Sequence, residues 1–141
     1  MLPLAHIGTA VLLSKAARAS TPFAVLGTLT PDLVDKPAAW LLKVAPRGRY
    51  LGHTLLSCLL LSLALAQLSG PRAGLGFGLG YLSHLLGDSE EPVPWLMPLV
   101  RYDYPRNNRF RLDLSRRLLL REAAGLALIL FFARSSHRGK A

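Results

Sequence analysis

Histidine and aspartate residues in four segments of the chain have the types and spacing expected of metal ligands. His84 and Asp88 are four residues apart in Gly-Tyr-Leu-Ser-His-Leu-Leu-Gly-Asp, a spacing that places both side chains on one face of a helix. An unpaired carboxylate in such an apolar setting is costly, and a divalent cation is a suitable partner for it. His6, Asp32 and His53 offer the same chemistry from three other segments. We therefore predict that these five side chains bind a divalent metal together.

Each of these residues also has a simpler structural interpretation. His6 could be a hydrogen-bonded core residue, Asp32 or Asp35 could cap a following helix, and His53 could be a surface or capping side chain. The chain has only four histidines and eight acidic residues, so their joint placement favours a metal site over independent structural roles. Nitrogen and carboxylate ligands without thiolates favour zinc, with manganese or iron as alternatives.

The composition indicates one domain that associates with a membrane. The chain has 141 residues, of which 51% are hydrophobic, and carries 17 Lys and Arg against 8 Asp and Glu. The arginines cluster in connectors beside long Leu and Ala runs, a pattern that fits a membrane protein better than a nucleic-acid binder, so no nucleic-acid partner is expected. We expect a single helical metal-binding domain over residues 1–133 and a basic tail over residues 134–141.

The pattern of apolar residues predicts an all-α fold, a compact bundle of about five helices of which some are membrane-embedded. The expected helices cover residues 3–19, 35–45, 53–68, 73–88 and about 113–132. A short apolar stretch over residues 23–29 should end at a turn or helix boundary at Thr30-Pro31-Asp32, because proline disfavours helical backbone at the residue before it. The run 53–68 is long enough either to be buried or to approach a membrane span. The single cysteine, Cys58, lies in that run and is expected to be a core or lipid-facing residue.

Glycines at positions 74 and 78, and at 76 and 80, form two overlapping small-xxx-small patterns. Such patterns allow close packing between helices. The same glycines do not match the Gly-x-Gly-x-x-Gly fingerprint, and no Lys-Ser/Thr follows them as in a P-loop. Nucleotide binding is therefore excluded for this stretch.

Four sequence elements together resemble a known family. They are His6, then Gly-Thr-Leu-Thr-Pro-Asp32, then Arg47-Gly-Arg-Tyr-Leu-Gly-His53, and then Gly80-Tyr-Leu-Ser-His84-Leu-Leu-Gly-Asp88. Over about residues 1–100 they resemble the membrane-bound metal-dependent hydrolases of the YdjM type. In the order of its ligands the chain also resembles a reduced form of the zinc-dependent phospholipase C and P1 nuclease fold.

The resemblance implies that His53, His84 and Asp88 hold one metal, and that His6 and Asp32 contribute to it or to a second. An Asp-Leu-Val-Asp spacing stands where the family usually has Asp-x-Asp, which puts Asp35 in doubt as a ligand. No second His-x-x-x-His/Glu pair follows Asp88, so we expect one or two ions and not the three of the phospholipases.

Metal chemistry predicts the reaction. A bound divalent ion lowers the pKa of water and polarises the oxygen under attack, which suits hydrolysis of an ester or phosphoester. Asp32 or Asp35, where it is not itself a ligand, could take the proton from water, and Arg47 and Arg49 could bind an anionic phosphate. An alternative role for the two arginines is a cytoplasmic loop that obeys the positive-inside rule.

The expected partners are membrane lipid and a small-molecule or lipid phosphoester, and the expected location is the bacterial inner membrane. Two rival interpretations remain open. One is a non-catalytic helical membrane protein in which a metal is structural or the protein is a scaffold, and the other is a soluble lipid-processing enzyme.

Overall fold

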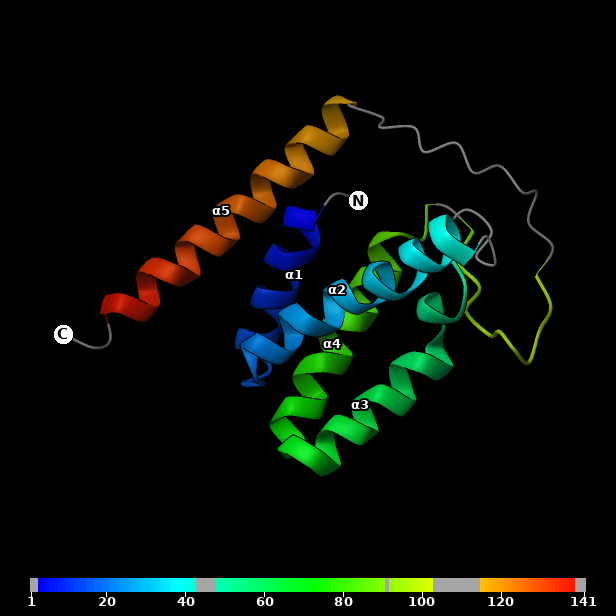
Figure 1. Ribbon diagram of the computed structural model, residues 1–141. Helices are drawn as coiled ribbons and strands as arrows, with labels where there is room; N and C mark the ends of the chain where they lie inside the picture. Colours follow the sequence, from blue (N-terminus) through cyan, green and yellow to red (C-terminus); the bar gives the residue numbers. More distant parts are fainter. Residues whose placement is uncertain (1–2, 43–47, 91, 103–114, 139–141) are drawn as a thin grey trace.

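The computed structural model describes residues 3–42, 48–90, 92–102 and 115–138, and within these ranges the regular structure is entirely helical (Figure 1). This confirms the all-α prediction. The five α-helices are α1 (Pro3–Ala16), α2 (Thr21–Pro37), α3 (Leu55–Ser69), α4 (Pro71–Gly87) and α5 (Arg116–Arg138). A π-helical segment, η1 (Ala38–Leu42), extends α2, and a 3-10 turn, η3 (Leu51–His53), precedes α3. None of the described helices combines the length and the hydropathy needed for a bilayer crossing.

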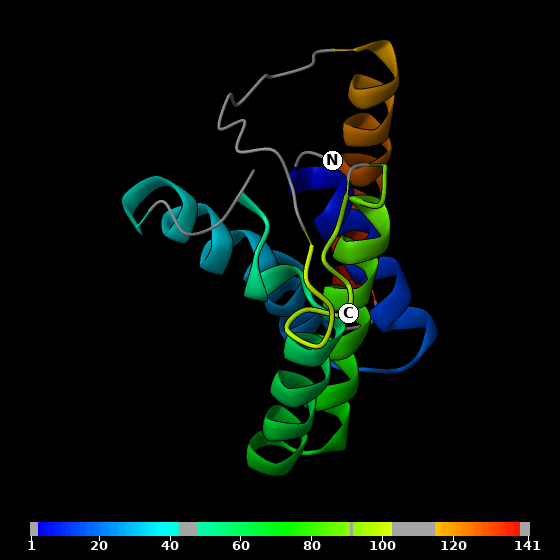
Figure 2. The same cartoon turned by 90° about the vertical axis from the view of Figure 1, so that its right-hand side faces the viewer.

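Helix α4 lies at the centre and contacts α1, α2 and α3, while α3 and α4 form an antiparallel hairpin (Figures 1 and 2). The two glycine patterns face different neighbours. A Cβ at Gly76 would lie 2.3 Å from the carbonyl oxygen of Ser20, and a Cβ at Gly80 would lie 1.9 Å from that of Ala24. A Cβ at Gly74 would lie 2.5 Å from the Cβ of Ala66. One pattern therefore brings α2 against α4 and the other brings α3 against α4, which confirms the close packing that the sequence predicted.

Helix α5 packs against α1 at a second pair of glycines (Figure 1). A Cβ at Gly8 would lie 2.5 Å from the carbonyl oxygen of Gly125. The Glu122 carboxylate also accepts hydrogen bonds from the backbone N–H groups of Leu4 and Ala5, at 2.9 and 3.2 Å. Because the first N–H groups of a helix have no partner within the helix, this carboxylate from α5 completes the start of α1.

The expectation of a turn or helix boundary at Thr30-Pro31-Asp32 is wrong. Helix α2 continues through Pro31 to Pro37, and Asp32 is a helical residue. A proline inside a helix lacks the N–H donor, and its ring crowds the carbonyl four residues earlier. Pro31 is fully buried, so packing against its neighbours offsets this cost. The hydroxyl of Thr30 donates to the Leu26 carbonyl at 2.8 Å. Up to Leu42, the expected short helix over residues 35–45 is instead the end of α2 continued by η1, and residues 43–45 lie outside the described residues.

The other boundaries agree with the sequence within a few residues. Helix α3 begins after His53 because Thr54 is its N-cap, whose hydroxyl accepts from the N–H of Ser57 at 3.1 Å. Cys58 is buried in a core with Phe77, Tyr81, Leu85 and Val93, as expected of a core residue. Helix α5 reaches Arg138, so residues 134–138 of the predicted tail are helical.

Candidate metal centre

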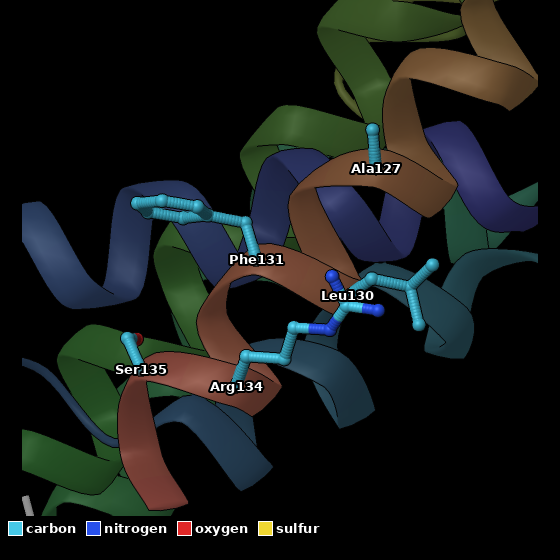
Figure 3. A pocket seen from close by; sticks show the side chains of 5 residues that line it. All are labelled: Ala127, Leu130, Phe131, Arg134 and Ser135. Atoms are coloured by element: carbon cyan, nitrogen blue, oxygen red, sulfur yellow. The ribbon is translucent and has the colours of Figure 1, made fainter. Parts of the chain in front are cut away.

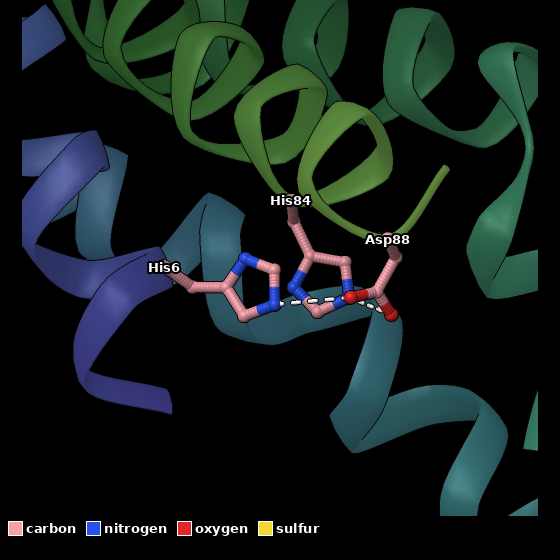
Figure 4. A group of neighbouring side chains, drawn as sticks. All are labelled: His6, His84 and Asp88. Atoms are coloured by element: carbon pink, nitrogen blue, oxygen red, sulfur yellow. Dashed lines mark ion pairs between the residues drawn. The ribbon is translucent and has the colours of Figure 1, made fainter. Parts of the chain in front are cut away.

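All five predicted ligands lie at the same end of the helical bundle. His6 comes from the second turn of α1, Asp32 from the end of α2, His53 from η3, and His84 and Asp88 from the end of α4. Figure 4 shows the imidazoles of His6 and His84 and the carboxylate of Asp88 pointing toward one another. The side chains form two overlapping groups, each with its ligand atoms within 4.8 Å, that share His84: His6, His84 and Asp88, and Asp32, His53 and His84.

The second group forms a compact triangle of ligand atoms. The Nε2 atoms of His53 and His84 are 3.4 Å apart, and each lies 3.9 Å from Oδ1 of Asp32. Ligands bound tetrahedrally at about 2.0–2.2 Å are separated from each other by roughly 3.3–3.6 Å. The triangle therefore needs only a small contraction to bind one ion. Oδ2 of Asp88, at 3.8 Å from Nε2 of His84, is placed to be a fourth ligand.

Asp35 contacts Nδ1 of His53, the ring nitrogen that does not face the other ligands. Its carboxylate is fully buried and accepts hydrogen bonds from the N–H groups of Tyr50 and Gly52, and it lies 2.7 Å from Nδ1 of His53. A carboxylate on Nδ1 fixes the tautomer in which Nδ1 carries the proton and the Nε2 lone pair is free for a metal. Gly52 permits this contact, because a Cβ there would lie 2.8 Å from Oδ1 of Asp35.

On the side of the cluster that contains His6, the Asp88 carboxylate contacts both an arginine and an imidazole. Nη2 of Arg49 lies 2.8 Å from Oδ2 of Asp88, and Nε2 of His6 lies 3.3 Å from Oδ1 of the same carboxylate. The rings of His6 and His84 are stacked with their centroids 4.1 Å apart. Asp88 thus connects α4 to both α1 and the segment before α3.

The donor set suits a divalent cation. Nδ1 of His53 faces Asp35, so the lone pair of its Nε2 points toward Nε2 of His84, 3.4 Å away, and toward the Asp32 carboxylate. Acceptor atoms of His53 and Asp32 thus converge on one point, and a cation there would balance them. Two imidazole nitrogens and an aspartate oxygen around one point are ligands that zinc, manganese and iron accept.

Burial changes the protonation of two of these groups. Burial, with the charge of His6 adding to it, lowers the pKa of His84 to about 4, although Asp32 and Asp88 oppose the shift. Burial raises the pKa of Asp88, but hydrogen bonds from His6 and Arg49 outweigh that effect and hold it well below its usual range. At neutral pH the cluster therefore presents a neutral His84 and an ionised Asp88, the forms in which both bind a metal.

The remaining predicted residues have different positions. Arg49 lies in the cluster on Asp88, whereas Arg47 is outside the described residues. Sequence reasoning missed Lys36, whose Nζ lies 2.6 Å from Oδ2 of Asp32. It also missed Tyr81, whose hydroxyl donates to the Gly52 carbonyl. The i,i+4 spacing of Asp32 and Lys36 would have revealed the first pair, had Asp32 been placed on a helix.

A separate hollow lies on the outer side of α5 (Figure 3). It is lined by Ala127, Leu130, Phe131, Arg134 and Ser135. None of the candidate ligands lines it, so the predicted chemistry belongs to the His/Asp cluster.

Comparison with known proteins gives one match. The model of a family described as YdjM inner membrane protein matches residues 1–139. No curated protein and no solved structure shows a significant match to the chain.

Proposed function

The chain belongs to the YdjM inner membrane protein family, and we propose that it is a metal-dependent hydrolase that cleaves an ester or phosphoester. The match confirms the resemblance expected from residues 1–100 and extends it over almost the whole chain. The inner membrane is accordingly its location, as predicted. The relationship to zinc-dependent phospholipase C and P1 nuclease has no support among the comparisons and stays a prediction.

One observation carries the proposal. His53, His84 and Asp32, from three separate elements, direct three ligand atoms to one point, and Asp35 orients His53 through Nδ1. A carboxylate behind a histidine that faces other ligands is the usual arrangement of a built metal site. A chance cluster of buried polar residues has no reason to include that supporting carboxylate.

The same geometry favours one ion. Both groups of ligands contain His84, and its Nε2 is the atom that lies near His53, Asp32 and Asp88 alike. A neutral imidazole nitrogen has one lone pair and therefore binds one cation. We assign Asp32, His53 and His84 as its ligands, with Asp88 and His6 as outer neighbours, so that the fourth position is available for water, as a catalytic ion requires. Zinc is our first choice for the ion, with manganese and iron as the alternatives.

A divalent ion bound there would polarise the substrate oxygen and lower the pKa of water. We assign the proton-accepting role to Oδ2 of Asp32, the oxygen that does not face His53 and His84, because this carboxylate is one quarter exposed. Asp35 is assigned a positioning role instead, since its carboxylate is engaged by three protein groups. Lys36 and Arg49 would bind an anionic group such as a phosphate, and Arg47 stays a candidate for the same role.

A non-catalytic membrane protein is the second candidate. The ion pairs Asp88–Arg49 and Asp32–Lys36 already balance both carboxylates within the protein. A closed site of four or five protein ligands would leave no position for water, as in structural zinc sites. The family membership is compatible with either function.

Metal analysis of detergent-purified protein tests the site. We expect one equivalent of a transition metal per chain in the wild type and its loss in His84→Ala, because His84 belongs to both ligand groups. Glu90→Ala is the matched control, since Glu90 is an exposed acid near Asp88 that pairs with Arg121 at 2.6 Å. Equal, near-zero metal in all three proteins would remove the proposal.

Catalysis needs its own measurement. We expect metal-loaded protein to hydrolyse a chromogenic phosphodiester, and the chelated protein and the Asp32→Asn variant to lose that activity. If metal-loaded wild-type protein is inactive on phosphodiester, phosphomonoester and carboxylic ester substrates, the structural role of the metal is the better interpretation.

A further inference from the structure

Tyr81 places the polar end of its side chain against the turn that carries His53. It lies on α4 three residues before His84 and is fully buried. Its ring packs in the apolar core, with its centroid 5.7 Å from that of Phe77. The hydroxyl extends from this core and donates to the carbonyl of Gly52 in η3. A buried tyrosine hydroxyl needs a partner, and here the partner is the backbone next to a candidate ligand.

The backbone of Gly52 is held from two sides. Its N–H donates to Oδ1 of Asp35 on α2 at 2.8 Å, and its carbonyl accepts from Tyr81 on α4. The absence of a side chain allows this close approach to α2, because a Cβ at Gly52 would lie 3.0 Å from the carbonyl oxygen of Pro31. Gly52 therefore connects α2 with α4, the two helices that supply the ligands other than His53.

The two contacts of Gly52 together set the relative positions of the three assigned ligands. Asp35 and Asp32 both belong to α2, so the first contact fixes η3 relative to Asp32. The second contact fixes η3 relative to His84, because Tyr81 and His84 are three residues apart on one face of α4. The Nε2 atoms of His53 and His84 are 3.4 Å apart, within the roughly 3.3–3.6 Å expected between ligands of one tetrahedral ion. A movement of η3 away from α4 would widen this separation.

We propose that Tyr81 is a positioning residue of the metal site, whose hydroxyl holds His53 at ligand distance from His84. The proposal rests on the metal site proposed above and adds a residue that is not itself a ligand. A phenylalanine would fill the same place in the core without contacting Gly52, so packing does not account for the hydroxyl. The competing role is purely structural, in which the hydroxyl only satisfies a buried carbonyl. The two roles differ in whether the metal responds when the hydroxyl is lost.

Tyr81→Phe separates the two roles, with cobalt(II) as the probe. The visible absorption of cobalt(II) depends on the number and geometry of its ligands, and competition with a chelator measures its affinity. We expect Tyr81→Phe to bind cobalt about tenfold more weakly than the wild type, because a group that orients a ligand contributes at least that much. We also expect a changed absorption spectrum, which a loss of stability by itself would not produce.

Ser83→Ala is the matched control. Ser83 also lies on α4, and its buried hydroxyl donates to a backbone carbonyl, that of Gly80, at 2.7 Å. Since this bond stays within α4, we expect the wild-type cobalt spectrum and affinity. Circular dichroism reports whether each variant is folded. If Tyr81→Phe fails to fold, 4-fluorophenylalanine at position 81 fills the space of the hydroxyl without donating, and the same loss of affinity is expected.

Two results would overturn the positioning role of Tyr81. Wild-type cobalt affinity and an unchanged spectrum in either folded non-donor variant would mean that the hydroxyl serves stability only. An equal loss of affinity in Ser83→Ala would mean that the site responds to any weakening of α4 and not to the contact with Gly52. Both results leave the metal site standing, whereas a wild-type protein that binds neither cobalt nor zinc would overturn the site and this proposal together.

Discussion

The two sides of the His/Asp cluster are built differently. On one side His53 is held by Asp35, whose carboxylate also accepts two backbone N–H groups. On the other side the ring of His6 is positioned by stacking on His84 and by the Asp88 carboxylate, which lies 3.3 Å from Nε2 of His6. A histidine with a supporting carboxylate is oriented before the metal arrives, whereas one without it must be ordered by the metal. The comparison indicates that the metal affinity comes chiefly from the His53 side.

The largest effect on metal binding is expected from His53→Ala. This change removes a ligand atom and leaves the Asp35 carboxylate buried without its imidazole partner. We expect loss of stoichiometric metal from the purified protein, measured by elemental analysis, while circular dichroism reports whether the helices persist. A folded His53→Ala protein with a full equivalent of metal would show that the His6 side is the true site.

A smaller loss of metal affinity is expected from Asp35→Asn. The amide keeps the shape of the side chain but can no longer fix the protonated Nδ1 of His53 as a carboxylate does. Loss of such a supporting group typically weakens metal binding about 10- to 100-fold. Competition with a chromophoric chelator measures the affinity, and Glu90→Gln is the control. Unchanged affinity would mean that Asp35 serves only the backbone around Gly52.

His6→Ala should weaken metal binding less than His53→Ala or Asp35→Asn. Because His6 is treated as an outer neighbour of the ion, we expect the affinity to fall by less than about tenfold, or about 1.4 kcal/mol. The same chelator competition measures it, alongside His53→Ala. A His6→Ala protein that loses all its metal would reverse the comparison between the two sides.

The smallest effect is expected from Glu122→Gln, which acts on the His6 side at a distance. Glu122 accepts from Leu4 and Ala5, the two residues before His6. Replacing a carboxylate at a helix N-terminus by a neutral amide costs about 0.3–1 kcal/mol. We expect a slightly lower midpoint of unfolding and unchanged metal content, with Glu90→Gln as the control. A Glu122→Gln protein as stable as the wild type would show that α5 does not stabilise α1 in this way.

The local chemistry of the chain could be predicted from single segments. The i,i+4 spacing of His84 and Asp88 places both on one face of a helix, and the glycines of α4 allow close packing, because both features depend only on helical periodicity. The apolar runs predicted α1, α3, α4 and α5 for the same reason, whereas α2 was divided at Pro31 into an apolar stretch and a separate short helix. The prediction of a helix boundary at Pro31 was wrong because burial of the proline against its neighbours outweighed the local preference of the preceding residue for extended backbone.

Which side chains could bind a cation follows from the sequence, since the types and the helical spacing of His84 and Asp88 are properties of one segment. The roles of the other residues depend on how the helices pack. Asp35 and Asp32 are three residues apart on the same helix, yet one faces Nδ1 of His53 and the other faces its Nε2. That difference depends on where η3 lies against α2, a contact between residues about 18 positions apart that no local pattern specifies.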